Sequence, residues 1–508
     1  MVVRFAPSPT GPLHIGGVRT ALYNYLLARR HGGRFILRIE DTDQTRYVPG
    51  AEEYIIEALT WCGITFDEGP HLGGPHAPYR QSERKDIYAA YAHELVRRGA
   101  AYYAFDTEEE LEEMRRRFEA AGMVAPQYNS ITRAYMKNSL TLPSDEVEAR
   151  LKSGSYVIRF LMPRDREVRF YDEIRGWVSF HTQQLDDKVL LKSDGMPTYH
   201  LANVVDDHLM AVTHVIRGEE WLPSTPLHVL LYEAFGWEMP RFAHLPLLLR
   251  PDGGGKLSKR DGDQLGFPVF PLRWKDPFTG ETAEGYRERG FLPEGLINYI
   301  ALLGWHPASD QEIFTMEQLI QTFSIDRVSK AGARFDYEKA KWINQQHLRR
   351  RSAESLLPLV RPLWEAQTGT PPPSDATLKA LIELAQERAQ TLPDIIDAVA
   401  FYNRRPSFPL PPSLEAKLSS EVIAHAAEVE SIFQSISVWQ KEEIEAALKA
   451  WAKSMKLPIG KVLITLRVAL TGEEAGPALY AVLAVLGQQE VLGRWKQFME
   501  AYVVSGRV

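Results

Sequence analysis

The first hundred residues alternate between short apolar runs and amphipathic segments. Val2–Phe5 has the composition of a buried strand and leads into a turn rich in proline and glycine. Apolar residues then recur at helical spacing from Gly16 to Arg30, where two glycines end the pattern. A second strand-like run covers Arg34–Ile39, and a second helical segment covers Ala51–Trp61. This order predicts an α/β domain built on a parallel, doubly wound sheet.

The pattern changes between about Ala100 and Asp187. A strongly charged helical segment at Glu108–Ala121 is followed by three short strand-like runs, at 156–162, 168–171 and 177–180. We interpret this stretch as an α+β insertion that interrupts the α/β domain. Apolar strands resume after it, so we place the return to the parent domain near residue 188.

Beyond residue 245 the chain becomes a loop and then largely helical. Arg250–Gly255 contains three consecutive glycines, and we expect it to be a mobile loop that carries the basic run Lys256–Arg260. Residues 262–284 are rich in proline and contain scattered aromatics, which indicates a surface excursion. From about Leu292 onward the pattern predicts helices, with proline clusters between the helical blocks.

Composition narrows the class of protein. Hydrophobic residues make up 44% of the 508 residues and charged residues 25%, as in ordinary globular proteins. No stretch approaches the roughly 18 apolar residues of a membrane span, and Arg4 argues against a signal peptide. The single cysteine, Cys62, excludes an intrachain disulfide framework and a cysteine-rich zinc site. We therefore expect a cytoplasmic enzyme that has no membrane partner.

The net charge of −7 argues against a protein that coats nucleic acid along its whole surface. Residues 327–351 are an exception, because eight basic residues there face two acidic ones, a local net charge of +6. Such a run fits a polyanion-binding face, and it equally fits a solvated helical surface.

The turn before the first helix has the composition of an anion site. The start of a helix presents free backbone N–H groups and the positive end of the helix dipole. His14 lies in this turn, where an imidazole can donate to a phosphate. Lys256 and Lys259 on the glycine-hinged loop can add positive charge when a nucleoside triphosphate is bound. Taken singly, the turn also fits a structural strand-to-helix connection, and the lysines also fit a solvated basic loop.

Several motifs resemble the bacterial-type glutamyl-tRNA synthetases, a family of class I aminoacyl-tRNA synthetases. The two ATP motifs of the class are similar to Pro7–Gly17 and Lys256–Arg260. Similarity to the glutamyl branch lies in Phe35–Asp43, Tyr79–Arg84, Leu190–His208 and Arg217–Trp221. The resemblance is strong to about residue 345, and Lys461–Gly472 is similar to the C-terminal segment of the family.

The resemblance implies a multidomain α/β architecture. It implies a Rossmann-type catalytic domain at 1–80 and 188–252, and an inserted domain at 81–187 that binds the tRNA acceptor end. It further implies a stem-contact domain at 253–350, which includes the ATP loop at 256–260. The last part is an all-helical anticodon-binding region at 351–508, as one body or as two subdomains divided near residue 400.

The implied reaction has two steps. ATP, with Mg²⁺, and glutamate form glutamyl-adenylate and pyrophosphate, and the glutamyl group then passes to the 3′-terminal ribose of tRNA(Glu). The family activates glutamate with the tRNA already bound, and its members are expected to be monomers. No protein-held metal is implied, and we predict no zinc because the insertion contains no cysteine.

The resemblance assigns roles residue by residue. The catalytic residues are His14, Lys256 and Lys259. ATP binding is assigned to Pro9, Thr10, Gly11, His14, Ile15, Gly16, Gly17, Lys256, Leu257, Ser258 and Lys259. Glutamate binding is assigned to Arg4, Ser8, Glu40, Tyr199, Asn203 and Arg217. Candidate tRNA contacts are Arg349, Arg350 and Arg388, each of which also fits a helix-surface arginine.

The assigned arginines suit the substrate chemically. A guanidinium binds a carboxylate through two parallel hydrogen bonds, and glutamine would leave that fork unpaired. Discrimination between the two amino acids then needs no editing site. The neighbouring Asp41 and Asp43 are expected to hold their loop and the arginines rather than to act in catalysis.

The sequence departs from the family pattern at two places, and we consider three alternative functions. Gly17 stands where the class motif usually has a second histidine, and residues 262–284 are longer than the usual connection. One alternative is an enzyme that also charges tRNA(Gln). Another is the short paralogue that glutamylates queuosine in tRNA, which lacks the helical region found here after residue 351. The third is a synthetase-like RNA-binding protein without catalysis, which the intact motif residues disfavour.

Overall fold

The computed structural model describes residues 1–504, which fold into two compact units. Unit 1 contains Met1–Glu288 and Leu296–Tyr337. Unit 2 contains Arg289–Gly295 and the chain from Glu338 onward. Within the described part of the chain, no helix combines the length and the apolar character that crossing a membrane requires.

Unit 1 is a mixture of helices and strands. Its helices are α1 (Ile15–Arg30), α2 (Ala51–Trp61), α3 (Lys85–Arg97), α4 (Glu108–Ala120), α5 (Ser144–Ser153), α6 (Tyr199–Leu209), α7 (Thr225–Phe235), α8 (Lys259–Leu265) and α10 (Met316–Thr322), and α9 (Pro293–Ala301) begins in unit 2. Its strands are β1 (Val2–Phe5), β2 (Arg34–Leu37), β3 (Ala101–Ala104), β4 (Val157–Phe160), β5 (Glu167–Asp172), β6 (Gly176–His181), β7 (Val189–Leu191), β8 (His214–Gly218), β9 (Arg241–Leu245), β10 (Leu248–Leu249), β11 (Trp274–Lys275), β12 (Thr282–Ala283) and β13 (Ala333–Arg334).

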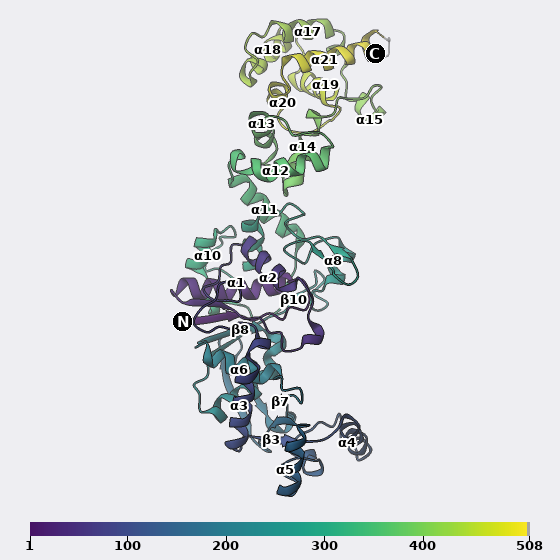
Figure 1. Ribbon diagram of the computed structural model, residues 1–508. Helices are drawn as coiled ribbons and strands as arrows, with labels where there is room; N and C mark the ends of the chain where they lie inside the picture. Colours follow the sequence, from purple (N-terminus) through teal and green to yellow (C-terminus); the bar gives the residue numbers. More distant parts are fainter. Residues whose placement is uncertain (505–508) are drawn as a thin grey trace. The chain divides into compact units, whose positions relative to one another are not determined.

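The predicted parallel sheet is confirmed. Strand β1 pairs in parallel with β2, and β9 pairs in parallel with both β8 and β5. Thr213, next to β8, donates its backbone N–H to Val2 O at 2.9 Å, so β8 lies beside β1. Helix α1 packs alongside β1 (Figure 1). The apolar side chains of β1 are buried. The carboxyl ends of β1, β2 and β8 therefore lie along one edge, where folds of this type bind ligands.

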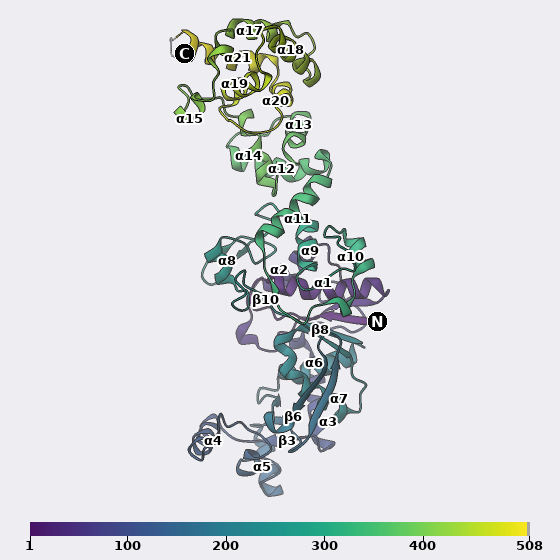
Figure 2. The ribbon, with the colours of Figure 1, turned by 180° about the vertical axis from the view of Figure 1, so that it is seen from behind.

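The α+β insertion has a sheet of its own, in which β4 pairs in antiparallel fashion with β3 and β7. Strand β7 follows the expected return at residue 188, yet its partner β4 lies inside the predicted insertion. Conversely, β5 lies inside the predicted insertion and pairs with β9, and α7 packs on β5 (Figure 2). The boundaries of the insertion accordingly stay a prediction, because a local pattern does not reveal which sheet a strand joins.

The surface excursion expected at 262–284 is wrong for residues 267–274. Its apolar side chains are buried at Phe267, Val269, Phe270, Leu272 and Trp274. The hydroxyl of Tyr54 in α2 donates to Leu272 O at 2.6 Å and accepts from Leu272 N at 3.1 Å. Proline-rich composition predicts an irregular backbone, but it does not predict whether that backbone is buried. Residues 263–266 are exposed, and so is Phe278 at the tip of the β11–β12 hairpin.

Two other expectations need adjustment. Among the described residues after Leu292, the regular elements are helices apart from the short strand β13, which pairs with β10 through Leu248 and Ala333. The glycine loop is a closed turn, since Arg250 N donates to Gly255 O at 2.9 Å and Leu249 forms a β-bridge with Lys256. Its expected mobility stays a prediction.

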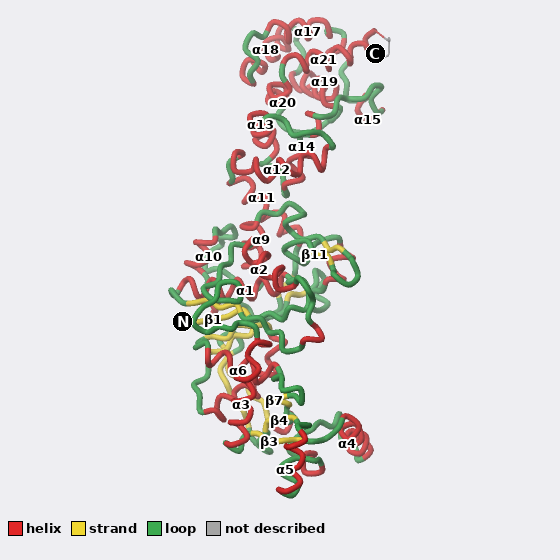
Figure 3. The backbone as a smooth tube through the Cα atoms, viewed as in Figure 1, coloured by secondary structure: helices red, strands yellow, loops and turns green. Residues whose placement is uncertain are grey.

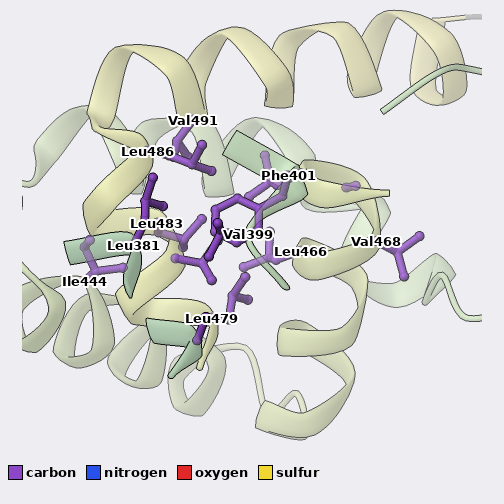
Figure 4. Packing of buried hydrophobic residues seen from close by; sticks show 14 of the residues in the cluster. Leu381, Val399, Phe401, Ile444, Leu466, Val468, Leu479, Leu483, Leu486 and Val491 are labelled. Carbon is purple, nitrogen blue, oxygen red and sulfur yellow. The ribbon is translucent and has the colours of Figure 1, made fainter. Parts of the chain in front are cut away.

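Unit 2 consists of helices and loops in its described part, as predicted (Figure 3). Its helices are α11 (Tyr337–Arg350), α12 (Ala353–Thr368), α13 (Asp375–Ala385), α14 (Leu392–Ala398), α15 (Pro412–Glu415), α16 (Ser420–Ile423), α17 (Ala426–Ser435), α18 (Lys441–Ser454), α19 (Ile459–Thr471), α20 (Leu479–Leu486) and α21 (Gln488–Met499). One hydrophobic cluster joins residues on both sides of position 400, such as Leu381 and Leu483 (Figure 4).

Candidate active site

Two adjoining cavities in unit 1 open at the carboxyl ends of β1, β2 and β8. The first, of about 250 Å³, is lined by Arg4, Phe5, Ala6, Pro7, Ser8, Leu13, Gly16, Gly17, Thr20, Glu40, Tyr199, Asn203, Ile216, Arg217, Gly218, Glu220 and Trp221. The second, of about 470 Å³, is lined by His14, Gly16, Gly17, Arg19, Thr20, Gly218, Glu220, Pro246, Leu247, Leu248, Lys256, Leu257 and Ser258. The two cavities share five lining residues, namely Gly16, Gly17, Thr20, Gly218 and Glu220. The start of α1 and Glu220 therefore belong to the walls of both cavities.

All six residues assigned to glutamate line the first cavity. Of those assigned to ATP, His14, Lys256, Leu257 and Ser258 line the second cavity, and Gly16 and Gly17 line both. The others, Pro9, Thr10, Gly11, Ile15 and Lys259, line neither cavity. The assignment of all these residues to glutamate and ATP stays a prediction.

His14 is the N-cap of α1. Its Nδ1 accepts a hydrogen bond from Gly16 N at 3.0 Å, which places the proton of the neutral ring on Nε2. That Nε2 is buried and has no hydrogen-bond partner among residues 1–504. Burial, assisted by the nearby charge of Lys256, lowers the pKa of His14 to about 4. The ring is therefore a neutral donor at the wall of the second cavity, and its N–H has no acceptor among residues 1–504.

The free backbone N–H groups expected at the start of α1 are not free, so that expectation is wrong. Ile15 N donates to Val269 O at 2.9 Å, and Gly16 N donates to the His14 ring. Gly17 N and Val18 N both donate to His14 O, at 2.8 and 3.1 Å. An anion at this helix start would meet the helix dipole and His14 Nε2 rather than unpaired amides.

Gly17 fits its place closely. A Cβ atom added there would lie 2.5 Å from Leu13 Cδ1, so any larger residue requires Leu13 to move. Where the class motif usually has a second histidine, this chain has Gly17, and the Leu13 side chain fills the space beside it.

The two loop lysines lie in different surroundings. Lys256 lines the second cavity, with its Nζ 3.3 Å from the Glu220 carboxylate. Lys259 is the first residue of α8, and its Nζ is 4.0 Å from Glu281. Ser258 caps this helix together with Asp261 in a capping box, which fixes the helix start. Both lysine side chains are largely exposed and can turn toward a bound anion.

A buried charge network supports the floor of the first cavity. Asp207 in α6 pairs with Arg4 at 3.0 Å and with Arg38 at 2.7 Å. Arg38 also pairs with Glu40 at 3.0 Å, and Asn203 donates to the same Glu40 oxygen at 3.2 Å. Burial raises the pKa of Glu40, and the charges of Arg38 and Arg4 oppose that effect. The network holds the Glu40 carboxylate in place, and it also occupies the Arg4 guanidinium.

Asp41 and Asp43 hold their own loop, as expected, but they do not hold the arginines. Asp41 accepts from Ser82 N and Oγ at 2.8 and 2.6 Å, and Asp43 accepts from Thr45 N. Arg4 and Arg38 are instead paired with Asp207 of α6, and Arg84 is paired with the preceding Asp206. Sequence reasoning missed both, although they lie one helical turn beyond Asn203.

Arg217, near the end of β8, is a buried arginine whose hydrogen-bond partners are neutral. Its Nε donates to His244 Nε2 at 3.1 Å, Nη1 donates to Tyr199 OH at 2.8 Å, and Nη2 donates to Thr225 Oγ1 at 3.0 Å. Burial lowers the pKa of His244, so this imidazole is neutral near pH 7. No carboxylate among the described residues forms an ion pair with Arg217, whose side chain is only 5% exposed.

Trp221 and Glu220 complete the wall, and neither had an assigned role. The Trp221 ring packs against Tyr199 in a tilted arrangement, with ring centroids 4.3 Å apart. Both residues follow β8, just as Glu40 follows β2, so their position after an apolar strand was the signal that could have identified them.

The candidate tRNA contacts lie in unit 2. Arg349 and Arg350 are exposed in the last turn of α11. Arg388 is also exposed, and its Nη1 donates to Gly476 O at 3.2 Å. Their role in RNA binding stays a prediction.

Residues 1–342 match the family model described as "tRNA synthetases class I (E and Q), catalytic domain". The chain belongs to this family of class I tRNA synthetases. Residues 353–499 of the synthetase match the model described as "Anticodon binding domain". The family resemblance inferred from the motifs and the α/β fold class followed by a helical anticodon-binding region are therefore confirmed.

Individual relatives extend over nearly the whole chain. The synthetase is 53% identical to the glutamate–tRNA ligase of Amoebophilus asiaticus, over 99% of both chains. It is also 53% identical to the glutamate–tRNA ligase of Cytophaga hutchinsonii, over 97% of this chain and 96% of the relative. A crystal structure of a glutamate tRNA ligase from Elizabethkingia meningosepticum, in complex with its amino acid, superimposes with a TM-score of 0.93 at 50% identity. It covers 98% of this chain and 99% of that one.

Proposed function

We infer that the synthetase is a glutamate–tRNA ligase that activates glutamate with ATP and transfers it to tRNA(Glu). The observation that carries the choice of amino acid is the buried charge of Arg217. Arg4, the other arginine that lines the first cavity, pairs with the Asp207 carboxylate. Arg217 has only neutral partners. An uncompensated buried cation is costly, so a bound carboxylate would stabilise this cavity when it is occupied.

The opposite charge on the same cavity suits the other end of the amino acid. Glu40 presents a carboxylate that Arg38 and Asn203 hold in place, and it can accept hydrogen bonds from an ammonium group. Arg217 and Glu40 both line the first cavity, so one ligand can meet both. We propose that the glutamate side chain meets Arg217 and that its amino group lies near Glu40 and Ser8.

In the first step an oxygen of the α-carboxylate attacks the α-phosphorus of ATP, and the bond to pyrophosphate breaks. His14 donates from Nε2 to a phosphate oxygen, and Lys256 and Lys259 supply positive charge to the departing pyrophosphate. In the second step a hydroxyl of the terminal ribose of tRNA attacks the glutamyl carbonyl, and AMP leaves.

ATP carries Mg²⁺, which neutralises phosphate charge when it is bound. The described residues offer no group of three or more His, Cys, Asp or Glu side chains that could hold a metal ion. We therefore propose that the phosphates and water supply the ligands of Mg²⁺, as is common for this ion. We also propose that the synthetase acts as a cytoplasmic monomer.

The test is ATP–pyrophosphate exchange with purified tRNA(Glu), comparing glutamate with glutamine. We expect exchange with glutamate and almost none with glutamine, since glutamine leaves the Arg217 fork without a carboxylate. Exchange with glutamine alone would refute the assignment, and no exchange with either would favour an RNA-binding protein without catalysis. Equal charging of purified tRNA(Gln) would contradict the specificity for tRNA(Glu).

A further inference from the structure

Three buried side chains on neighbouring strands form a line that ends at Arg217. Asp172 comes from the end of β5, His244 from β9 and Arg217 from β8. His244 Nδ1 lies 2.6 Å from the Asp172 carboxylate, and its Nε2 lies 3.1 Å from Arg217 Nε. Asp172 and His244 are completely buried, and neither lines the cavities described above.

The hydrogen bonds fix the tautomer of His244. Since an ionised carboxylate only accepts, Nδ1 carries the proton and donates to Asp172. Nε2 is then an acceptor, and it receives the Nε–H of Arg217. Asp172 is fixed in turn, because its Oδ1 accepts the backbone N–H groups of Ile174 and Arg175 at 3.0 and 2.8 Å. This ordering resembles the role of a carboxylate that orients a histidine in other enzymes.

The line also has an electrostatic consequence. A carboxylate in direct contact with Arg217 would neutralise the guanidinium, as Asp207 does for Arg4. Here a neutral imidazole stands between the anion and the cation. Asp172 can therefore stabilise the buried charge from a distance and leave the guanidinium without a carboxylate partner.

We propose that Asp172 and His244 are positioning residues that hold Arg217 in the orientation and charge state required to bind the substrate carboxylate. This inference rests on the proposed function, because it takes Arg217 as the group that meets glutamate. It predicts that glutamate specificity depends on two residues that do not touch the amino acid.

Asp172→Asn provides the most direct test. Oδ1 accepts the backbone N–H groups of Ile174 and Arg175, whereas Oδ2 accepts one backbone N–H, that of His244 at 3.1 Å, and faces the His244 ring. The amide NH₂ of the variant is therefore expected on the side of Oδ2, facing His244. The imidazole would then accept at Nδ1 and carry its proton on Nε2, where it opposes the N–H of Arg217. We expect the KM for glutamate to rise about 10-fold or more, as expected for losing a hydrogen bond to a charged group, with the KM for ATP unchanged.

Two variants of His244 extend the test. His244→Leu removes the acceptor and is expected to raise the KM for glutamate as Asp172→Asn does. His244→Gln offers an amide oxygen to Arg217 and is expected to restore most of the affinity. As a control, Asp187→Asn alters an equally buried carboxylate that pairs with Arg133, and it is expected to leave the KM for glutamate unchanged. Thermal unfolding of each variant shows whether it is folded.

The outcomes separate this inference from the proposed function. If Arg217→Gln raises the KM for glutamate but Asp172→Asn and His244→Leu do not, the positioning role is refuted and the proposed function stands. If Arg217→Gln itself leaves the KM unchanged, the assignment of the carboxylate site fails. Equal increases in the KM for glutamate and for ATP in folded Asp172→Asn protein would indicate general disruption and would also overturn the positioning role.

Discussion

His14 has two separable roles, and substitution by asparagine distinguishes them. Its Nδ1 caps α1 by accepting from Gly16 N, and its Nε2 is a buried donor that no described residue uses. Asparagine is a strong N-cap whose side-chain oxygen can accept from the same amide, but it has no group that reaches the position of Nε2. Alanine removes both functions. His14→Asn should therefore retain stability and lose activity, whereas His14→Ala should lose both.

The magnitudes follow from the two hydrogen bonds. A lost N-cap costs about 1 kcal/mol of stability, which His14→Ala should show and His14→Asn should not. A hydrogen bond to a charged group contributes about 1.5–3 kcal/mol, which corresponds to roughly 10- to 150-fold in kcat/KM for ATP. Both variants should lose activity within that range, because both lack the Nε2 donor.

The pH dependence follows from the depressed pKa. Because the pKa of His14 is about 4 in the folded protein and about 6.5 in an unfolded chain, the unfolded state binds the proton first as the pH falls. The contribution of His14 to stability is thus fully present above about pH 6.5 and is lost as the pH falls toward 4. Between pH 6.5 and 8 its donor function should not change.

Urea unfolding and tRNA-dependent ATP–pyrophosphate exchange measure these effects in the same protein samples. Wild-type exchange by His14→Asn would refute the donor role of Nε2. A loss of stability in His14→Asn equal to that in His14→Ala would refute the capping account.

Three other substitutions give independent checks. Lys259→Ala should lower kcat for adenylate formation by about 100-fold and leave the KM for glutamate unchanged in steady-state kinetics; unchanged kcat would mean that this lysine does not reach the phosphates. Asp207→Asn leaves Arg4 without a charged partner and Arg38 with Glu40, and it should cost about 3–5 kcal/mol in urea unfolding of unit 1, which a loss below 1 kcal/mol would contradict. Leu483→Ala opens a cavity in the core of unit 2 and should cost about 2–5 kcal/mol, while the same change at the exposed Leu265 should have little effect.

Local periodicity predicted most of the elements of the fold. The helix Ala51–Trp61 has the predicted bounds, and α1 begins one residue before the expected Gly16. The pattern could not predict the partners of β5 and β7, because strand pairing is decided by contacts far apart in the sequence. For the same reason the pattern did not predict that Phe270 is buried. The Phe270 and His14 rings form a T-shaped pair with centroids 6.3 Å apart.

The sequence predicted which residues lie at the site, but it did not predict how their roles differ. The motifs brought Glu40, Asn203 and Arg217 to one cavity. They did not distinguish Arg217 from Arg4, since the difference is the presence of Asp207 on a distant helix. Asp172 and His244 belong to no motif quoted above, and only the three-dimensional structure places them beside Arg217.

The length of the buried segment 267–274 matters for the function of the synthetase, because this segment is connected to both ATP motifs. It follows α8, which begins at Lys259, and its Val269 O accepts from Ile15 N at the start of α1. Adding or removing a residue there would shift the carbonyl and strain both the lysine loop and the histidine turn. The hairpin tip at Phe278 is 72% exposed, so it is the place where an affinity tag or a fluorophore can be inserted without disturbing either ATP motif.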